Sequence, residues 1–349
     1  MTDVLAPFAY LNGKPTSTAK LKLQPQHFVV REQLGYTFSG EGEHLMLRIR
    51  KTGENTSFVA NELAKACGVK SKDVSWAGLK DRHAVTEQWL SVHLPGKEQP
   101  DLSAFLAQYP SIEILAVDRH NKKLRPGDLT GNEFEVTLAE VTEPEAVLAK
   151  LEQMAKFGVP NYFGAQRFGR DGNNLEEARR WGRENVRTRN QNKRSLMLST
   201  ARSWIFNRVL SERIEQGCFQ TVLLGDLVQT GKMLEEASAD NLAELQAQVD
   251  NGQAQITAPL AGDNALPTKE VALALENPHL EAEADLMALI RGNRMRHERR
   301  ALALKPSDLT WQHQGDNITL KFSLPAGNFA TSLVRELAQE ITVERSYDN

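Results

Sequence analysis

The order of strand-like and helix-like segments constrains the fold of this chain most. Roughly the first 140 residues mostly show patterns typical of strands, such as the alternating run HLMLRIRK at 44–51. Helical periodicity then dominates, and a clear strand pattern returns only in NITLKFSLP at 317–325. A sheet-forming part interrupted by a helical part predicts an α+β protein with a mainly helical domain inserted into a sheet domain. We expect these boundaries: a discontinuous sheet domain at 1–155 and 305–349, and an insertion at 156–304.

Local signals place individual elements within this plan. The segments 73–78 and 86–94 have strand patterns, and Asp81 lies in the loop that joins them. The segments 281–304 and 328–341 have helical periodicity, and we expect both to be helical. Element boundaries obtained in this way are uncertain by a few residues.

The composition and charge exclude several classes of protein. No apolar run in the 349 residues reaches the ~18–20 residues of a membrane helix, and the N-terminal segment lacks a secretory-signal pattern. The spacing of Cys67 and Cys218 fits no zinc motif and indicates free thiols, so we expect a cytoplasmic protein. The net charge of −3 argues against a uniformly basic surface. Three basic runs are either local phosphate-binding patches or solvated faces: Arg119–Arg125, Arg187–Arg194 and Arg291–Arg300.

Asp81 is a candidate catalytic residue because it stands between Lys80 and Arg82 in the segment 77–89, AGLKDRHAVTEQW. Nearby cations keep a carboxylate ionised, and an ionised carboxylate can act as a nucleophile that forms and then breaks a covalent bond. The alternative is an aspartate in a charged surface turn. The residues around Asp81 leave both interpretations open.

The sequence predicts neither a metal site nor a nucleotide cofactor. His83 and Glu87 have a spacing that would pair them on a helix, but their segment has the pattern of a loop followed by a strand. The sequence contains no glycine-rich phosphate-binding motif and no nucleophile elbow. We therefore expect chemistry that depends on side chains alone.

Aromatic and amide side chains within polar segments are candidates for base recognition. Bases of single-stranded RNA stack on aromatic rings, and Phe28, Phe134 and Phe329 occur in such segments. Core packing is the alternative for each ring. Asn132 can bond a base edge or stabilise a turn. Arg335 lies in the last expected helix. It is either a functional cation or an arginine exposed to solvent at the surface.

Five motifs together resemble the tRNA pseudouridine synthase D (TruD) family. They occur in the family's order and extend over nearly the whole chain: GLKDRHAVTEQW at 78–89, GNEF at 131–134, GVPNYFGAQRFG at 158–169, QNKRSLMLSTARSWIFN at 191–207 and LPAGNFATSLVREL at 324–337. The resemblance implies a pseudouridine synthase core, with a mixed, largely antiparallel sheet and flanking helices. It also implies that the inserted, mainly helical part is a TRUD domain.

The resemblance also implies roles for individual residues. The catalytic aspartate of the family falls on Asp81. Phe134 takes the place that a tyrosine has in other pseudouridine synthases, and Lys22 and Arg335 become the expected cations near the carboxylate. The full set of implied substrate-binding positions is Phe28, Asn132, Phe329, Lys22, Phe134 and Arg335.

The activity implied by the resemblance is the isomerisation of uridine to pseudouridine at position 13 of certain tRNAs. The base would be flipped out, and its glycosidic bond would be broken and rejoined without a metal, cofactor or protein partner. Whether Asp81 attacks the ribose or assists a glycal route stays open. Two other functions stay in view: a non-catalytic tRNA-binding chaperone, and an RNA-cleaving enzyme that uses His83 or His297.

Overall fold

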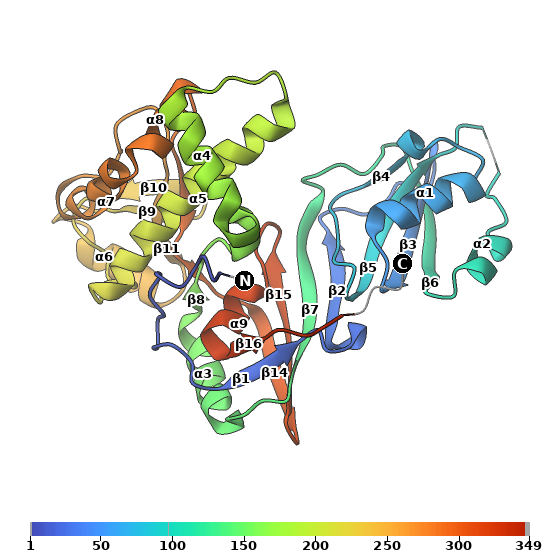
Figure 1. The fold of residues 1–349 in the computed structure, drawn as a ribbon, viewed down its shortest axis with the longest axis horizontal. Helices are drawn as coiled ribbons and strands as arrows, with labels where there is room; N and C mark the ends of the chain where they lie inside the picture. The colour runs from blue at the N-terminus through green and yellow to red at the C-terminus, as the bar shows by residue number, and fades with distance from the viewer. Residues whose placement is uncertain (1, 97, 346–349) are drawn as a thin grey trace. The chain divides into compact units, whose positions relative to one another are not determined.

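The computed structural model describes residues 2–96 and 98–345, which form two compact units. One unit, here called the sheet unit, comprises Pro15–Ala155, Pro306–Ala330 and the described residues from Leu337 onward. The other, here called the helical unit, comprises the described residues up to Lys14, Lys156–Lys305 and Thr331–Glu336. Each unit has its own sheet and its own arrangement of helices (Figure 1).

A mixed, mostly antiparallel sheet forms the sheet unit. Its main path runs in the order β14-β15-β7-β2-β5-β3-β6, while β1 pairs with β7 and β16, and β4 pairs with β5. Among the strand pairs formed by the described residues, β2–β5 and β1–β16 are parallel and the others are antiparallel. The strands are β1 (Thr18–Leu21), β2 (Phe28–Leu34), β3 (His44–Thr52), β4 (Val74–Trp76), β5 (Val85–His93), β6 (Ile112–His120), β7 (Leu129–Ala139), β14 (Ser307–Gln314), β15 (Asn317–Pro325) and β16 (Gln339–Ile341). The predicted α+β class and the largely antiparallel sheet are confirmed.

Helices cover one region of this sheet because apolar side chains alternate along β3. Leu45, Leu47 and Ile49 are fully buried and pack against Leu63 of α1 and Phe105 of α2. Gly68 follows the first of these helices with a φ of 67°, a left-handed conformation that ends a helix. The helices are α1 (Thr56–Ala66), α2 (Ser103–Gln108) and α3 (Pro144–Phe157), the last of which continues across the boundary between the units.

A long central helix, α5, organises the helical unit (Figure 1). Its buried face contributes Ile205, Phe206 and Val209 to an apolar core that also contains Trp181 of α4 and Ile290 of α8. The helices are α4 (Asn173–Glu184), α5 (Gln191–Glu215), α6 (Leu242–Asp250), α7 (Glu270–Ala282), α8 (Ala284–Gly292) and, in large part, α9 (Thr331–Leu337).

The helical unit also contains strands that the sequence patterns did not predict. A sheet in the order β10-β9-β11-β12 and a β8–β13 pair are formed by β8 (Val159–Pro160), β9 (Leu227–Thr230), β10 (Met233–Glu236), β11 (Ala254–Leu260), β12 (Glu298–Ala301) and β13 (Ala303–Leu304). Most of these strands are too short to show alternation, and β11 is buried at consecutive positions, which hides its period of two.

Two expected helices are shorter than predicted for related reasons. The segment 281–304 is helical only as far as Gly292, and its basic end becomes β12, which pairs with β11. The segment 328–341 is helical only in α9, and Gln339–Ile341 forms β16 beside β1. In both places, pairing with a strand distant in the sequence overrides the local helical preference.

None of the helices within residues 2–96 and 98–345 combines the length and apolar character that crossing a bilayer requires.

Candidate active site

A short loop between β4 and β5 presents Asp81 in the sheet unit. The loop backbone is held at several points by side chains of neighbouring elements. Thr56 accepts a hydrogen bond from the Lys80 backbone nitrogen at 3.1 Å, and the Gln88 side chain donates to the Gly78 carbonyl at 3.4 Å. The loop that carries the carboxylate is therefore ordered by its surroundings, as catalytic positioning requires.

The Asp81 carboxylate has a specific partner on each oxygen. Its Oδ2 accepts a hydrogen bond from Nζ of Lys22, and its Oδ1 accepts one from the backbone nitrogen of His83 at 2.7 Å. The Asp81 side chain is 33% exposed, so the carboxylate is partly covered and still accessible. Lys22 follows β1 and has a φ of 55°, a left-handed conformation that ends the strand at this point.

These contacts keep the carboxylate negatively charged. Burial by itself would raise the pKa of Asp81, but the hydrogen bond and the charge of Lys22, together with the bond from the His83 backbone, outweigh burial. The pKa of Asp81 is therefore lowered from its ordinary value of 3.8. Asp81 is ionised at neutral pH, which nucleophilic or basic chemistry needs.

A second lysine lies beneath the loop. Lys51, at the end of β3, is 1% exposed, and its Nζ donates to the Glu54 carbonyl at 2.7 Å and to the Asp81 carbonyl at 3.2 Å. Burial lowers the pKa of Lys51 to about 8, even though the charge of Asp81 acts in the opposite direction. Lys51 therefore fixes the backbone of Asp81, while Lys22 contacts its carboxylate.

A buried ion pair anchors the residue next to Asp81. Nζ of Lys80 donates to Glu32 Oε2 at 2.8 Å, and the two side chains are 8% and 0% exposed. The other oxygen, Glu32 Oε1, accepts a hydrogen bond from the Trp89 backbone nitrogen at 2.9 Å. The pair thus ties the Asp81 loop to β2 and β5. Lys80, which the sequence analysis considered as a cation for Asp81, pairs with Glu32 instead.

We expect replacement of Glu32 by Gln to lower the free energy of unfolding by about 2–3 kcal/mol, because the buried Lys80 ammonium loses its counter-charge. Urea unfolding followed by circular dichroism measures this change. Glu43→Gln is the matched control, since Glu43 is 65% exposed and pairs with His93 at the surface; it should cost less than about 0.5 kcal/mol. Equal costs for the two variants would contradict the anchoring role of Glu32.

A row of aromatic rings begins at Lys22. The Lys22 ammonium lies 4.4 Å from the ring centroid of Phe28, and the rings of Phe28 and Phe134 have centroids 6.1 Å apart. Phe134 in turn lies 5.4 Å from Phe322 of β15, its partner across the β7–β15 ladder. Phe28 and Phe134 are 7% and 6% exposed, so both pack mainly in the core. Lys22 therefore connects this apolar wall with the Asp81 carboxylate.

Asn132 and Phe329, in the same unit, have an unpartnered polar atom and an exposed ring, respectively. Asn132 shares a face of β7 with Phe134, two residues further along, and its Oδ1 is buried without a hydrogen-bond partner among the described residues. Phe329 lies in the connection after β15 and is 38% exposed. An unpartnered amide oxygen and an exposed ring are features that a bound base can use.

Arg335 contacts residues of the helical unit. Its Nη2 donates to the Phe8 carbonyl at 2.8 Å and to the Leu5 carbonyl at 3.1 Å, and its guanidinium lies 3.8 Å from the ring centroid of Tyr10. Asp81 belongs to the sheet unit, and the cation that lowers its pKa most is Lys22. A role for Arg335 near the carboxylate stays a prediction.

Lys51 and Glu32 contribute to the site but were not predicted from the sequence. The alternation along β3 contained a signal for Lys51, because Leu47, Ile49 and Lys51 occupy successive positions on one buried face. Only Lys51 among these carries a charge, and a charged residue at a core-facing position implies a specific polar partner. Glu32 offered no such signal, because its partner Lys80 is 48 residues away in the sequence.

Comparison with known proteins identifies the family. The family model described as tRNA pseudouridine synthase D (TruD) matches residues 7–176 and 173–337. A protein of Vibrio parahaemolyticus named tRNA pseudouridine synthase D is 70% identical over 347 residues, which cover 99% of this chain and 100% of the relative. A protein of Aliivibrio fischeri with the same name is 60% identical over 353 residues, covering 100% and 99% of the two chains.

A solved structure from Methanosarcina mazei, described under the name tRNA pseudouridine synthase D (TruD), has the same fold. Its TM-score is 0.74 at 22% identity, and the match covers 94% of this chain and 95% of that one. The five motifs, the family model and the full-length relatives agree. The chain belongs to the tRNA pseudouridine synthase D (TruD) family.

Proposed function

We propose that this protein isomerises uridine to pseudouridine at position 13 of certain tRNAs, with Asp81 as the catalytic residue. Membership of the TruD family supports the reaction and the tRNA substrate. The observation that carries the assignment of Asp81 is its carboxylate, which Lys22 and the His83 backbone keep ionised beside an aromatic wall. We further propose that the sheet unit is catalytic, that residues 156–304 form the TRUD domain, and that the protein works in the cytoplasm.

The reaction is an isomerisation, so its atoms balance within the nucleotide. The bond between N1 and C1′ breaks, the base turns, and a bond forms between C5 and C1′. The proton on C5 is then lost and N1 gains one. Asp81 either attacks C1′ as the base leaves or removes a ribose proton to give a glycal. Both routes require an ionised carboxylate, and the Lys22 contact supplies that state.

The target base has to leave its stack before Asp81 can reach the ribose, and unstacking costs a few kcal/mol. Phe329 is the best-suited residue to offset this cost, because its ring is 38% exposed, whereas Phe28 and Phe134 are buried. The unpartnered Oδ1 of Asn132 can accept a hydrogen bond from the imide N–H of uracil. This pairing favours uracil over cytosine, which carries no proton at that ring position.

Replacing Phe329 with Ala is expected to lower kcat/KM about 10- to 100-fold, because stacking contributes ~1–3 kcal/mol per base. Phe329→Tyr keeps a ring of similar size and should retain most of the activity. Steady-state kinetics on a tRNA transcript measures both variants. If the Ala and Tyr variants are equally impaired, a stacking role for this ring is contradicted.

The function is tested by incubating the purified protein with a tRNA transcript and mapping pseudouridine by mass spectrometry after chemical derivatisation. We expect one pseudouridine at position 13, and none in a transcript with cytidine at that position. Binding of the transcript without any pseudouridine would instead support the non-catalytic chaperone. A shortened transcript would support the RNA-cleaving alternative.

A further inference from the structure

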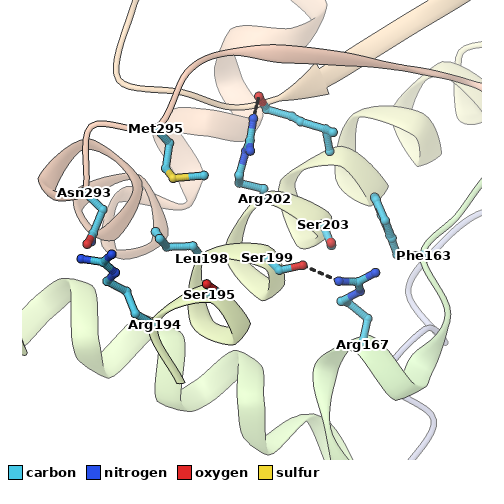
Figure 2. Close-up of a pocket in the computed structure, with 11 residues that line it drawn as sticks. Phe163, Arg167, Arg194, Ser195, Leu198, Ser199, Arg202, Ser203, Asn293 and Met295 are labelled. Atoms are coloured by element: carbon cyan, nitrogen blue, oxygen red, sulfur yellow. Dashed lines mark hydrogen bonds between the residues drawn. The ribbon is translucent and has the colours of Figure 1, made fainter. Parts of the chain in front are cut away.

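The helical unit contains a cavity lined by two motifs that the catalytic proposal does not use. Its volume is about 390 Å³, and it is lined by Phe163 and Arg167 of the segment 158–169 and by successive turns of α5. Figure 2 shows Ser195 and Ser199 along the α5 side of the cavity, with Arg194 toward one end and Arg167 toward the other. Hydroxyl and guanidinium groups therefore meet in one concave surface.

Arg167 of the lining and Arg300, which packs on the lining residue Phe163, have no carboxylate partner among the described residues. The guanidinium carbons of Arg167 and Arg300 lie 5.2 Å and 4.0 Å from the ring centroid of Phe163. Arg167 donates to the Ser199 hydroxyl, and Arg300 donates to the side-chain and backbone oxygens of Asn161 at 2.8 and 3.1 Å. Among residues 2–96 and 98–345, no carboxylate lies within ion-pair distance of either guanidinium.

Two arginines of the same unit whose side chains are fully buried are neutralised, whereas Arg167 and Arg300 are only partly buried. Arg213 pairs with Asp226 at 2.8 Å, and Arg299 pairs with Glu276 at 2.7 Å, with all four side chains at most 1% exposed. Such pairing is the rule, because an uncompensated buried charge is costly. Burial lowers the pKa of Arg167, and burial together with the charge of Arg167 lowers the pKa of Arg300 to about 10. An anion in the cavity would supply a counter-charge to Arg167, which lines it.

The other two arginines of the lining differ in their availability. Arg202 is committed to the structure, since its Nη2 donates to the carbonyls of Leu260 at 3.0 Å and Arg296 at 2.7 Å. Arg194 is bonded through Nη2 to the neutral side chain of Gln191, and no carboxylate in the described part of the chain pairs with it. Arg194 and Arg167 are thus the cations available to a ligand.

We propose that this cavity binds a phosphate group of the RNA backbone, with Arg167 and Arg194 as its cationic contacts and the hydroxyls of Ser195 and Ser199 as further donors. Arginines and hydroxyls are the usual partners of backbone phosphates, and such contacts orient an RNA without reading its sequence. The proposal rests on the proposed function, because it takes its ligand from the tRNA substrate. It adds a specific anchoring site in the helical unit.

Binding of a fluorescent tRNA transcript, measured by anisotropy over a range of salt concentrations, tests the site. Arg167→Gln and Arg194→Gln should each raise Kd about tenfold and reduce the slope of log Kd against log salt by about 0.7–0.9, the value for one lost phosphate contact. Arg183→Gln is the matched control, since that arginine is 58% exposed and already pairs with Asp285 at 3.1 Å. Compared with protein that carries Asp81→Ala alone, this control should change the affinity by less than about twofold and the salt slope by less than about 0.2.

Because Arg194 is partly exposed, Arg194→Gln should keep the fold even if Arg167→Gln does not. Thermal unfolding of both variants verifies that they are folded. Unchanged affinity and salt slope in a folded Arg194→Gln protein would overturn the proposal. Inorganic phosphate at constant ionic strength distinguishes the source of the phosphate. We expect that inorganic phosphate at millimolar concentrations does not compete with the tRNA transcript for binding. Competition that Arg194→Gln abolishes would assign the cavity to free phosphate and overturn the RNA assignment.

All binding measurements use protein that also carries Asp81→Ala, so they do not depend on turnover. If the pocket variants weaken binding but the unmodified protein makes no pseudouridine, only the proposed function fails. If the unmodified protein makes pseudouridine but the pocket variants bind normally, only the phosphate site fails.

Discussion

Replacing Asp81 with Asn is expected to lower the rate of pseudouridine formation by at least about 10⁴-fold, the scale of losing a catalytic nucleophile or base. Asparagine has nearly the same shape, but its single acceptor oxygen can keep only one of the hydrogen bonds from Lys22 and the His83 backbone, and its amide neither attacks C1′ nor removes a proton. Affinity for tRNA should change by less than about threefold, because most of that affinity comes from phosphate contacts.

Tritium release from uridine labelled at C5 measures turnover under single-turnover conditions, and filter binding measures affinity. Asp308→Asn is the matched control in the same unit, because Asp308 is exposed and asparagine tolerates its φ of 54°. The control should keep full activity. Substantial turnover by Asp81→Asn would show that Asp81 is not the catalytic residue. This conclusion does not depend on whether the cavity in the helical unit binds phosphate.

Replacing Lys22 with Met is expected to have the second-largest effect, a loss in kcat of about 10²–10³-fold, comparable to removing a preorganised charged donor. Methionine preserves the bulk of the side chain but removes the ammonium that bonds Asp81 Oδ2. Burial of the carboxylate is then opposed only by the contacts with His83, so the pKa of Asp81 should rise.

The pH dependence separates this effect from a simple loss of fold. In the unmodified protein the pKa of Asp81 is below 3.8, so activity that depends on its ionised form is present above that value and is lost as the pH falls through the lowered pKa. The same sign applies to the stability contributed by the Lys22–Asp81 pair. In Lys22→Met, the acidic limb of the pH–rate profile should move to higher pH.

Lys20→Met is the matched control for this variant, since Lys20 lies on β1 and pairs with Glu140 at the surface. Its pH–rate profile should coincide with that of the unmodified protein. Lys22→Arg keeps a positive charge, so it should retain part of the activity. Its acidic limb should lie close to that of the unmodified protein in the pH–rate profile. An unmoved acidic limb in Lys22→Met would show that Lys22 does not control the ionisation of Asp81.

Much of the local structure followed from the sequence because the relevant interactions are short in range. Alternation with a period of two predicted β3, a strand pattern predicted β5, and the position of Asp81 between two strand patterns placed it in a loop. The same local reasoning failed where distant strands pair. Arg291–Arg300 has helical periodicity, yet its last residues form β12 because β11 supplies the hydrogen-bonding partner. Periodicity records which face of an element is buried and contains no information about such partners.

The sequence by itself determined the family, the α+β class and the candidate aspartate, because ordered motifs and strand periodicity can be read along one chain. Only the tertiary structure decided which cation serves which acid. Lys80 and Arg82 are the neighbours of Asp81 in sequence, but its carboxylate bonds Lys22, 59 residues away, while Lys80 pairs with Glu32. Coulomb energy and desolvation depend on separation and burial in space, and these are set only when the strands of the sheet come together.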